Sequence, residues 1–382
     1  MLAEQITNYL EMHLPDMLAL LENLINRNTS SDYKPGIDAA GAIMAEELEK
    51  IGYSTEILEH PDCGNGVIAR YRGNEKQVLL ICHLDSVFAS GTDQLDTFKV
   101  KGNLAYGNGV VDMKACLVNC LYALKALYDL KVPDLPSITV FMSGDEEKGS
   151  LAVLEQIKEE GRKADWCIVT EGSRPQMAVV TQRKGNAYIR IHAHGRAAHA
   201  GNEPQVGRNA IDELALKIVK LRDLNNYDVG TTFTITKISG GQNRIIVPED
   251  AFLEADLRFY TMAEWEKLHA AVKQILSRPE IEGVQLDYEL TFNRPPLSLV
   301  NGVDRLHSIV AECSKELGMP YLTTQPGGVS DGNFVSAEGT PTIDGMGPTG
   351  GMMCSPEEFL EIDTMVPCAS RLALTLTKLG AL

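Results

Sequence analysis

Three short apolar segments of this sequence, each followed at once by a polar motif, constrain the fold more than any other feature. Residues 78–82, 138–142 and 166–169 are followed by HLDS, SGDEE and TEG respectively. Short apolar runs bounded in this way are typical of strands buried in a parallel sheet. Open α/β sheets bind ligands at the carboxyl ends of their strands, so the three motifs are predicted to converge on one crevice.

The order of the remaining elements predicts two domains. Residues 1–175 alternate helical and strand patterns, as a βαβ sheet requires. The middle third predicts, in chain order, strand 186–194, helix 208–221, strands 231–238 and 251–259, helix 263–276 and strand 284–290. This β-α-β-β-α-β order is that of a small antiparallel sheet with two helices on one face.

The chain is predicted to return to the first domain near residues 292–296 and to end in a helix at 369–379. We therefore expect a discontinuous domain of residues 1–178 and 294–382, interrupted by an inserted domain of residues 179–293. A length of 382 residues agrees with two domains.

Composition excludes several classes of partner. Lys and Arg number 35 against 52 Asp and Glu, for a net charge of −17, so neither nucleic acid nor an anionic membrane is an expected partner. The N-terminal segment carries acids where a signal peptide would carry Lys or Arg. The eight cysteines contain no CxxC pair, which favours reduced thiols. Together these features predict a cytoplasmic protein.

Two of the motifs carry residue types that bind metals. His83 and Asp85 follow a predicted strand one residue apart, so the imidazole could be a ligand and the carboxylate could fix its tautomer. A histidine with an ordinary surface hydrogen bond is the alternative for this pair taken alone. Asp112 lies in GNGVVDMKAC before an amphipathic helix, where a helix cap is the alternative to a ligand.

Acidic residues gather after the other two strands. Glu146 and Glu147 follow Asp145 directly, and Glu171 follows the third strand. Adjacent carboxylates at a strand end are usually solvated, but three together are also tolerated around a cation that relieves their repulsion. Four such motifs in one α/β domain predict a metal site rich in carboxylates.

The ordered motifs HLDSV, GNGVVDMKA, GDEEKGS, VTEG, GRAAHAGNEPQVGRNAI, GGVSDGNF and GTPTIDGMGPTGGMMCSPEEF span nearly the whole chain. In this order the sequence resembles the dinuclear-zinc metallocarboxypeptidases and deacylases. That family includes glutamate carboxypeptidase, acetylornithine deacetylase, succinyl-diaminopimelate desuccinylase and aminoacylases. The resemblance implies a zinc-binding α/β catalytic domain interrupted by a smaller ferredoxin-like lid domain, through which the chain would form a homodimer.

The resemblance also implies a metal-ligand set with two Zn²⁺ per subunit, for which Co²⁺ or Mn²⁺ are alternatives. Asp112 would bridge the two ions. His83 and Glu171 would hold one, and Glu147 would hold the other with a histidine of the last motif. With glutamate rather than aspartate at position 171, the motif resembles that of the carboxypeptidase and deacylase branches more than that of the tripeptidase and dipeptidase branches.

Roles in catalysis and substrate binding follow from the same resemblance. Glu146 would be the general base, and Asp85 would orient the histidine ligand. His199, in GRAAHAG, matches a lid histidine that reaches the site of the partner subunit and stabilises the oxyanion there, although a solvent-exposed turn histidine is the alternative. Arg258, in EADLRF, matches an arginine that holds the substrate carboxylate, although a surface ion pair is the alternative.

The sequence departs from the family pattern at two positions. Cys354 stands where the last motif has its histidine ligand, and a thiolate is a good zinc ligand at about 2.3 Å. Ile245 stands where the family places an asparagine three residues before a proline. Asn243 lies two residues earlier, on the same face of an extended chain, and is the candidate to replace it.

These features lead to one main hypothesis and two alternatives. The main hypothesis is a zinc hydrolase that cleaves an amide next to a free carboxylate, such as a C-terminal glutamate or an N-acyl amino acid. The first alternative is a silenced or single-metal relative that acts as a binding protein because of Cys354. The second is a thiol enzyme with Cys354 as nucleophile, which the surrounding acids disfavour.

Overall fold

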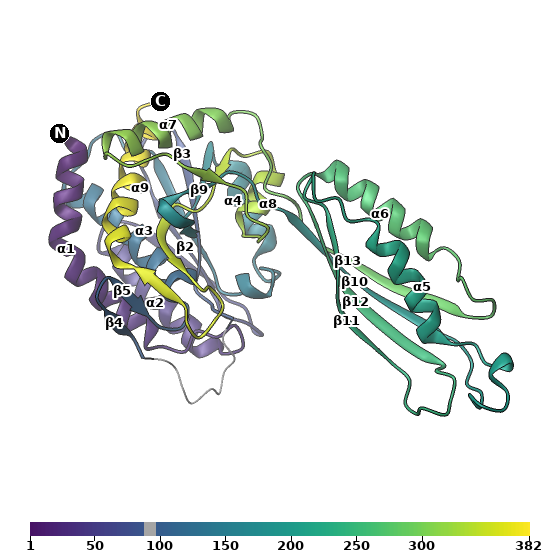
Figure 1. Ribbon diagram of the computed structural model, residues 1–382. Coiled ribbons are helices and arrows are strands. Elements are labelled where there is room, and N and C mark those ends of the chain that lie inside the picture. Colours follow the sequence, from purple (N-terminus) through teal and green to yellow (C-terminus); the bar gives the residue numbers. More distant parts are fainter. Residues whose placement is uncertain (88–96) are drawn as a thin grey trace. The chain divides into compact units, whose positions relative to one another are not determined.

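The computed structural model describes residues 1–87 and 97–382 (Figure 1). The chain divides into two compact units. Unit 1 comprises Met1–Gln182, Ser298–Pro326 and Ser330–Leu382, and unit 2 comprises Arg183–Leu297 and Gly327–Val329. The joins lie four residues later than the sequence analysis placed them, at 182/183 and 297/298 in place of 178/179 and 293/294. Strand β9 (Val179–Val180) pairs with β14 (Thr323–Thr324) inside unit 1, and this pairing keeps residues 179–182 in that unit.

The core of unit 1 is a six-stranded sheet with strand order β1-β2-β6-β3-β7-β15. The strands are β1 (Ser54–Leu58), β2 (Gly66–Tyr71), β3 (Gln77–His83), β6 (Ser137–Ser143), β7 (Trp166–Val169) and β15 (Thr342–Ile343). β3 pairs in parallel with both β6 and β7, and β15 pairs in parallel with β7. The three predicted buried strands are therefore confirmed, and their carboxyl ends share one edge of the sheet.

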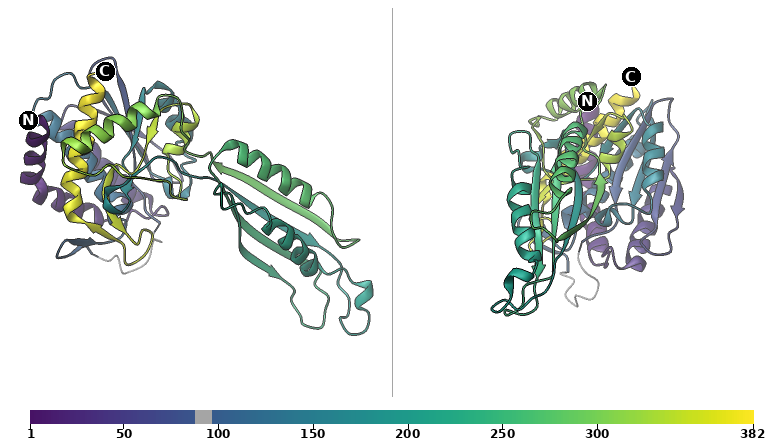
Figure 2. Two further views of the ribbon diagram at one scale, coloured as in Figure 1. Left: turned by 45° about the horizontal axis from the view of Figure 1, so that its top comes forward. Right: turned by 90° about the vertical axis from the view of Figure 1, so that its right-hand side faces the viewer.

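Helices cover both faces of this sheet because its strands alternate apolar side chains between two cores. One core packs against α1 (Leu2–Ile25), α2 (Lys34–Glu49), α3 (Ala115–Asp129), α7 (Val303–Glu316) and α9 (Met365–Gly380). The other packs against α4 (Leu154–Lys163) and α8 (Gly332–Ala337). Leu80 faces the first core and Leu79 faces the second, and each is 1 % exposed or less. Figure 2 shows the helices on the two sides of the sheet.

A second sheet in unit 1 has the strand order β4-β5-β17-β16-β8. Its strands are β4 (Lys99–Lys101), β5 (Leu104–Tyr106), β17 (Phe359–Glu361), β16 (Gly347–Gly351) and β8 (Gly172–Ser173). A Cβ atom on Gly350 would lie 2.1 Å from the carbonyl oxygen of Phe359, so only glycine allows this approach. The sheet places the C-terminal glycine-rich motif beside the segment that follows Glu171.

Unit 2 has the predicted β-α-β-β-α-β order. Its elements are β10 (Gly185–His194), α5 (Ala210–Arg222), β11 (Thr232–Gly240), β12 (Asp250–Phe259), α6 (Met262–Leu276) and β13 (Gln285–Arg294). The antiparallel sheet has the order β11-β12-β10-β13, and both helices lie on one of its faces (Figure 1). Asn209 caps α5 by accepting the N–H groups of Ile211 and Asp212.

No helix in the described part of the chain combines the length and the apolar character that crossing a bilayer requires.

Candidate metal centre

The predicted site residues of unit 1 meet where the parallel strands end. His83 is the last residue of β3 and lies opposite Ser143, the last residue of β6. Glu146 and Glu147 begin a short turn just after β6, and Glu171 lies two residues beyond β7. The carboxyl ends of neighbouring parallel strands thus bring together motifs that are far apart in sequence. This agrees with the expectation that open α/β sheets bind ligands at these ends.

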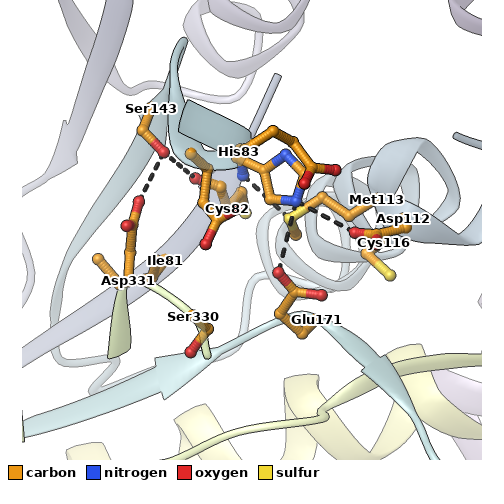
Figure 3. A network of polar contacts seen from close by, with 12 residues as sticks. Ile81, Cys82, His83, Asp112, Met113, Cys116, Ser143, Glu171, Ser330 and Asp331 are labelled. Atoms are coloured by element: carbon orange, nitrogen blue, oxygen red, sulfur yellow. Dashed lines mark hydrogen bonds and ion pairs between the residues drawn. The ribbon is translucent and has the colours of Figure 1, made fainter. Parts of the chain in front are cut away.

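The imidazole of His83 lies between two carboxylates (Figure 3). Its Nε2 atom is 3.2 Å from Oδ1 of Asp112 and 3.4 Å from Oε1 of Glu171. Ligand atoms of His83, Asp112 and Glu147 all lie within 4.8 Å of one another. A nitrogen and several carboxylate oxygens at this spacing are donors that a divalent metal binds.

The charge balance of the site also fits a cation. Burial raises the pKa of Glu147 to about 9, and the nearby carboxylates of Asp112 and Glu146 add to this rise. Burial alone would lower the pKa of His83, but hydrogen bonds to Asp112, Asp85 and Glu171 raise it well above its ordinary value. Both pKa shifts arise because several carboxylates are buried close together with little positive charge beside them. Bound metal ions would supply that positive charge.

Asp85 contacts both His83 and the turn that carries Glu146 and Glu147. Nδ1 of His83 lies 3.0 Å from the backbone carbonyl of Asp85 and 3.4 Å from its Oδ1 atom. The same carboxylate accepts the backbone N–H groups of Glu146 at 3.1 Å and of Glu147 at 3.2 Å, and the hydroxyl of Ser31 at 2.7 Å. With Nδ1 held in this way, Nε2 is directed toward Asp112 and Glu171.

A buried network supports the loop that carries Glu146 and Glu147. The carboxylate of Asp331, from the GGVSDGNF motif, accepts the hydroxyl of Ser143 at 2.7 Å (Figure 3). It also accepts the hydroxyl of Ser150. Asp145, the third acid of the predicted cluster, accepts the N–H of Ala152 at 2.9 Å. Asp145 thus shapes the turn that presents its two neighbours.

Glu358 is a buried residue at the site that the sequence analysis did not single out. Its Oε1 atom accepts the backbone N–H groups of Val111 at 2.8 Å and Asp112 at 2.9 Å. Its side chain is 1 % exposed, and burial raises its pKa to about 7. The sequence offered one indication of a role for Glu358, namely its position four residues after Cys354 in the last motif. That spacing does not show that Glu358 contacts Val111 and Asp112.

Cys354 lies at the same centre. Its Sγ atom donates to Oδ2 of Asp112 across 3.6 Å. Met352 and Cys354 have left-handed backbone conformations with φ of 55° and 59°, which cost non-glycine residues about 1 kcal/mol or more each. Burial raises the pKa of the Cys354 thiol to about 12, and the carboxylates of Asp112 and Glu147 add to the rise. This shift argues against a free thiolate nucleophile.

The remaining predicted residues belong to unit 2. His199 is exposed, and its Nδ1 atom accepts the N–H groups of Gly201 and Asn202, both at 3.1 Å. The ring proton of the neutral imidazole is therefore on Nε2, which makes Nε2 a hydrogen-bond donor. The segment around His199 pairs with the loop around residue 246, to which Asn243 belongs.

The two side chains proposed to contact substrate both have partners within unit 2. Oδ1 of Asn243 accepts the N–H of Ile245 at 3.1 Å, and the side chain of Ile245 is exposed. Arg258 forms two hydrogen bonds with Asp256, from Nε at 2.8 Å and from Nη2 at 2.9 Å. The surface ion pair considered for Arg258 is thus present.

Comparison with known proteins agrees with this architecture. Residues 79–378 match the family described as Peptidase family M20/M25/M40. The chain belongs to this family. Carboxypeptidase G2 of Pseudomonas sp. is 27 % identical over 378 residues, covering 96 % of this chain and 90 % of the relative. Succinyl-diaminopimelate desuccinylase of Bordetella parapertussis is 26 % identical over 357 residues, covering 88 % and 92 %.

A solved structure shows the same fold. The crystal structure of a tripeptidase from Staphylococcus aureus matches with a TM-score of 0.83 at 22 % identity, covering 97 % of this chain and 99 % of that one. The M20 relatives are hydrolytic metalloenzymes, so the resemblance inferred from the motifs and the predicted fold class are both confirmed. This chain is a hydrolase of that metal-dependent family.

Proposed function

We propose that this protein hydrolyses an amide bond next to a free carboxylate, as in a dipeptide with a C-terminal glutamate or an N-acyl amino acid. The observation that carries the proposal is the convergence of His83, Asp112 and Glu147 within 4.8 Å, with Glu171 beside them, in an M20 hydrolase. Carboxypeptidase G2 and succinyl-diaminopimelate desuccinylase support the substrate class, since both names describe the cleavage of small carboxylated molecules.

Two Zn²⁺ ions are the proposed cofactors, with Co²⁺ or Mn²⁺ as alternatives. Asp112 would bridge them, His83 and Glu171 would hold one, and Glu147 and Cys354 would hold the other. When bound, the ions supply Lewis-acid activation of the scissile carbonyl and a water of lowered pKa. The Cys354 thiol would lose its proton on binding, since thiolate is the form of cysteine that zinc binds.

Glu146 is the proposed general base. It lies three residues beyond the end of β6, and its backbone N–H donates to the Asp85 carboxylate at 3.1 Å. In the proposed reaction its carboxylate takes a proton from the attacking water as the oxygen bonds to the amide carbon. Glu146 then passes that proton to the leaving nitrogen as the C–N bond breaks. Because Glu146 is adjacent to the proposed ligand Glu147, the turn that Asp85 holds would position the base beside the metal ions.

Unit 2 is the proposed lid and dimerisation domain, and its residues are the proposed substrate contacts. Nε2 of His199 carries a proton and would donate to the developing oxyanion. Arg258 donates from Nε and Nη2 to Asp256, and from Nη1 to the backbone carbonyl of Gly327 at 3.4 Å, so the second N–H of Nη1 is the donor that would meet the substrate carboxylate. Asn243 would take the place of the asparagine that Ile245 replaces. The proposed homodimer forms through this unit.

The silenced relative considered as an alternative has no support from the comparisons. The relatives have the names of enzymes, and the residues proposed as base and ligands have supporting contacts in unit 1, such as Glu146 N–H with Asp85 and His83 with Asp112.

The test combines metal content with matched substrates. The purified protein would be assayed on N-acyl amino acids and on dipeptides ending in glutamate, each beside its C-terminal amide. We expect hydrolysis that a chelator abolishes and added Zn²⁺ restores. The acids should be cleaved at least about 100-fold faster than the amides. In the amides the substrate carboxylate is missing, so the guanidinium of Arg258 would lose its charged partner. Equal rates on acid and amide, or no hydrolysis by metal-loaded protein, would refute the proposal.

A further inference from the structure

Unit 1 contains a cavity of about 310 Å³ that the metal centre does not use. It lies where α3 ends, and its lining includes residues just after α2, the last residue of β2 and the start of β6. Three tyrosines and one lysine line it together with apolar side chains. Its volume is at the lower end of the range for small-molecule sites.

The cavity and the metal centre lie at opposite ends of the sheet. Ile138, which lines the cavity, is the second residue of β6, whereas Ser143 ends β6 opposite the ligand His83. Five residues of extended strand separate the two ends by roughly 17 Å. A small molecule in the cavity therefore does not reach the metal ligands.

The inner wall is apolar, with one polar exception. Leu124 and Leu127 of α3 and Ile138 are each at most 2 % exposed. Tyr53 is also buried, at 7 % exposure, and its ring lies 5.5 Å from that of Tyr71. In residues 1–87 and 97–382 no hydrogen-bond partner meets the Tyr53 hydroxyl. The hydroxyl oxygen is not among the fully enclosed side-chain atoms without a partner, so it is accessible to a small molecule, and a ligand atom in the cavity could accept its proton.

The Tyr53 hydroxyl is available as a donor. Burial raises the pKa of Tyr53 well above its usual value, so its hydroxyl keeps its proton. Tyr71 and Tyr128 add two further rings to the lining, and Tyr128 is 48 % exposed. Flat aromatic walls of this kind suit an aromatic or short aliphatic body.

Lys131 supplies a positive charge at the exposed side of the cavity. It follows α3 with a left-handed backbone (φ 53°), and its N–H donates to the carbonyl of Tyr128 at 3.0 Å. Within the described chain its ammonium group has no carboxylate partner. In a protein with a net charge of −17, a lysine that remains unpaired beside an apolar cavity favours an anionic ligand.

We propose that this cavity is a binding site for a small carboxylate with an aromatic or short aliphatic body. The carboxylate pairs with the ammonium group of Lys131 and accepts the hydroxyl of Tyr53. The body packs against Leu124 and Ile138. The site is separate from the metal centre and does not depend on the proposed substrate.

The test is a titration of the metal-loaded protein with 4-fluorophenylacetate, followed by ¹⁹F NMR. The neutral 4-fluorophenylacetamide, which has the same body, is the matched ligand. We expect saturable binding of the acid, about tenfold tighter than binding of the amide. Lys131→Gln should remove this preference, and Tyr53→Phe should weaken binding of the acid several-fold. Lys101→Gln is the control, since Lys101 is an exposed lysine of unit 1 that does not line the cavity.

Three results would overturn the proposal. They are the absence of saturable binding, binding that neither Lys131→Gln nor Tyr53→Phe changes, and binding that His83→Ala abolishes, which would place the probe at the metal centre. Tyr53→Phe removes one oxygen atom and Lys131 is exposed, so both variants are expected to fold. Unchanged metal content and circular dichroism would verify this.

Discussion

Oδ1 of Asp85 accepts the backbone N–H of Glu146 at 3.1 Å, and this hydrogen bond ties the end of β3 to the turn after β6. The neighbouring N–H of Glu147 donates to Oδ2 of the same carboxylate at 3.2 Å. Asp85 therefore does more than orient His83, the role that the family resemblance implies. It holds the proposed base and a proposed ligand close to the histidine, so one buried carboxylate positions three residues of the candidate site.

Asp85→Asn should lower metal affinity by about 10- to 100-fold, because the amide has a single acceptor oxygen for the N–H groups of Glu146 and Glu147 and no charge to attract them. Equilibrium dialysis against Zn²⁺ measures this. Ser31→Ala is the control, since it removes one donor to Asp85 at 2.7 Å and leaves the carboxylate in place. Its effect should stay below about tenfold. Unchanged affinity in Asp85→Asn would contradict this account of the turn.

Glu146→Gln should keep the metal content of the native protein and lower kcat by about 10²- to 10⁴-fold, since glutamine cannot accept the proton of the attacking water. Elemental analysis and steady-state kinetics on the best substrate measure the two quantities. Glu155→Gln, on α4 with a side chain 75 % exposed, makes the same chemical change away from the site and should leave both unchanged. Substantial turnover by Glu146→Gln would exclude Glu146 as the base.

Cys354→Ala should reduce the bound metal from two equivalents per chain to one, whereas Cys354→His should keep two. The reason is that the Cys354 sulfur lies 3.6 Å from the proposed bridging carboxylate of Asp112, and alanine offers no ligand atom in its place. Elemental analysis under reducing conditions measures the stoichiometry. Cys313→Ala, at a buried thiol in α7, is the control. Two equivalents retained in Cys354→Ala would show that the thiol is not a ligand.

Glu358→Gln and Glu358→Ala should differ sharply. Glutamine keeps an oxygen for the N–H groups of Val111 and Asp112, and burial already raises the pKa of Glu358 to about 7, so losing the charge costs little. Alanine leaves both buried N–H groups without an acceptor, which should destabilise unit 1 by about 1–3 kcal/mol and weaken metal binding. Chemical denaturation and metal titration measure these effects. Equal behaviour of the two variants would refute the role of the hydrogen bonds.

Glu280→Gln should destabilise unit 2 in a manner that depends on pH. Hydrogen bonds from Lys217 and Lys220 lower the pKa of Glu280 from its usual 4.5 to about 2. A lowered folded-state pKa means that the stabilisation is complete above about pH 4.5 and is lost as the pH falls toward 2. We expect a difference from the native protein of about 1–2 kcal/mol at pH 7, since the buried ammonium of Lys217 loses a charged partner at 2.8 Å.

Denaturant unfolding at a series of pH values measures that difference, which should shrink as the pH is lowered. Glu289→Gln is the control, because Glu289 is exposed on β13. A difference that stays constant between pH 7 and pH 3 would contradict the assignment of the titrating group.

The elements that were predicted well are those whose signal is local. The apolar run at 166–169 coincides with β7, and the alternating pattern at 251–259 coincides with β12 to within one residue. A strand buried on both faces, such as β7, requires a continuous apolar run, and a strand buried on one face, such as β12, requires an alternating pattern. Both patterns can be read in the sequence of the strand alone. β16 and β17 had no comparable signal, because both are short, β16 is rich in glycine, and the two strands form only when distant segments meet.

The motifs by themselves determined which residue types stand at the strand ends, and hence the family and the hydrolytic chemistry, and they predicted the metal-binding donors. Only the tertiary structure decided how these donors are held. Glu358 reaches backbone groups 246 and 247 residues away, and Cys354 approaches Asp112 through a left-handed backbone. The sequence pattern cannot show such contacts, because a hydrogen bond depends on where two segments lie in the folded chain rather than on their spacing along it.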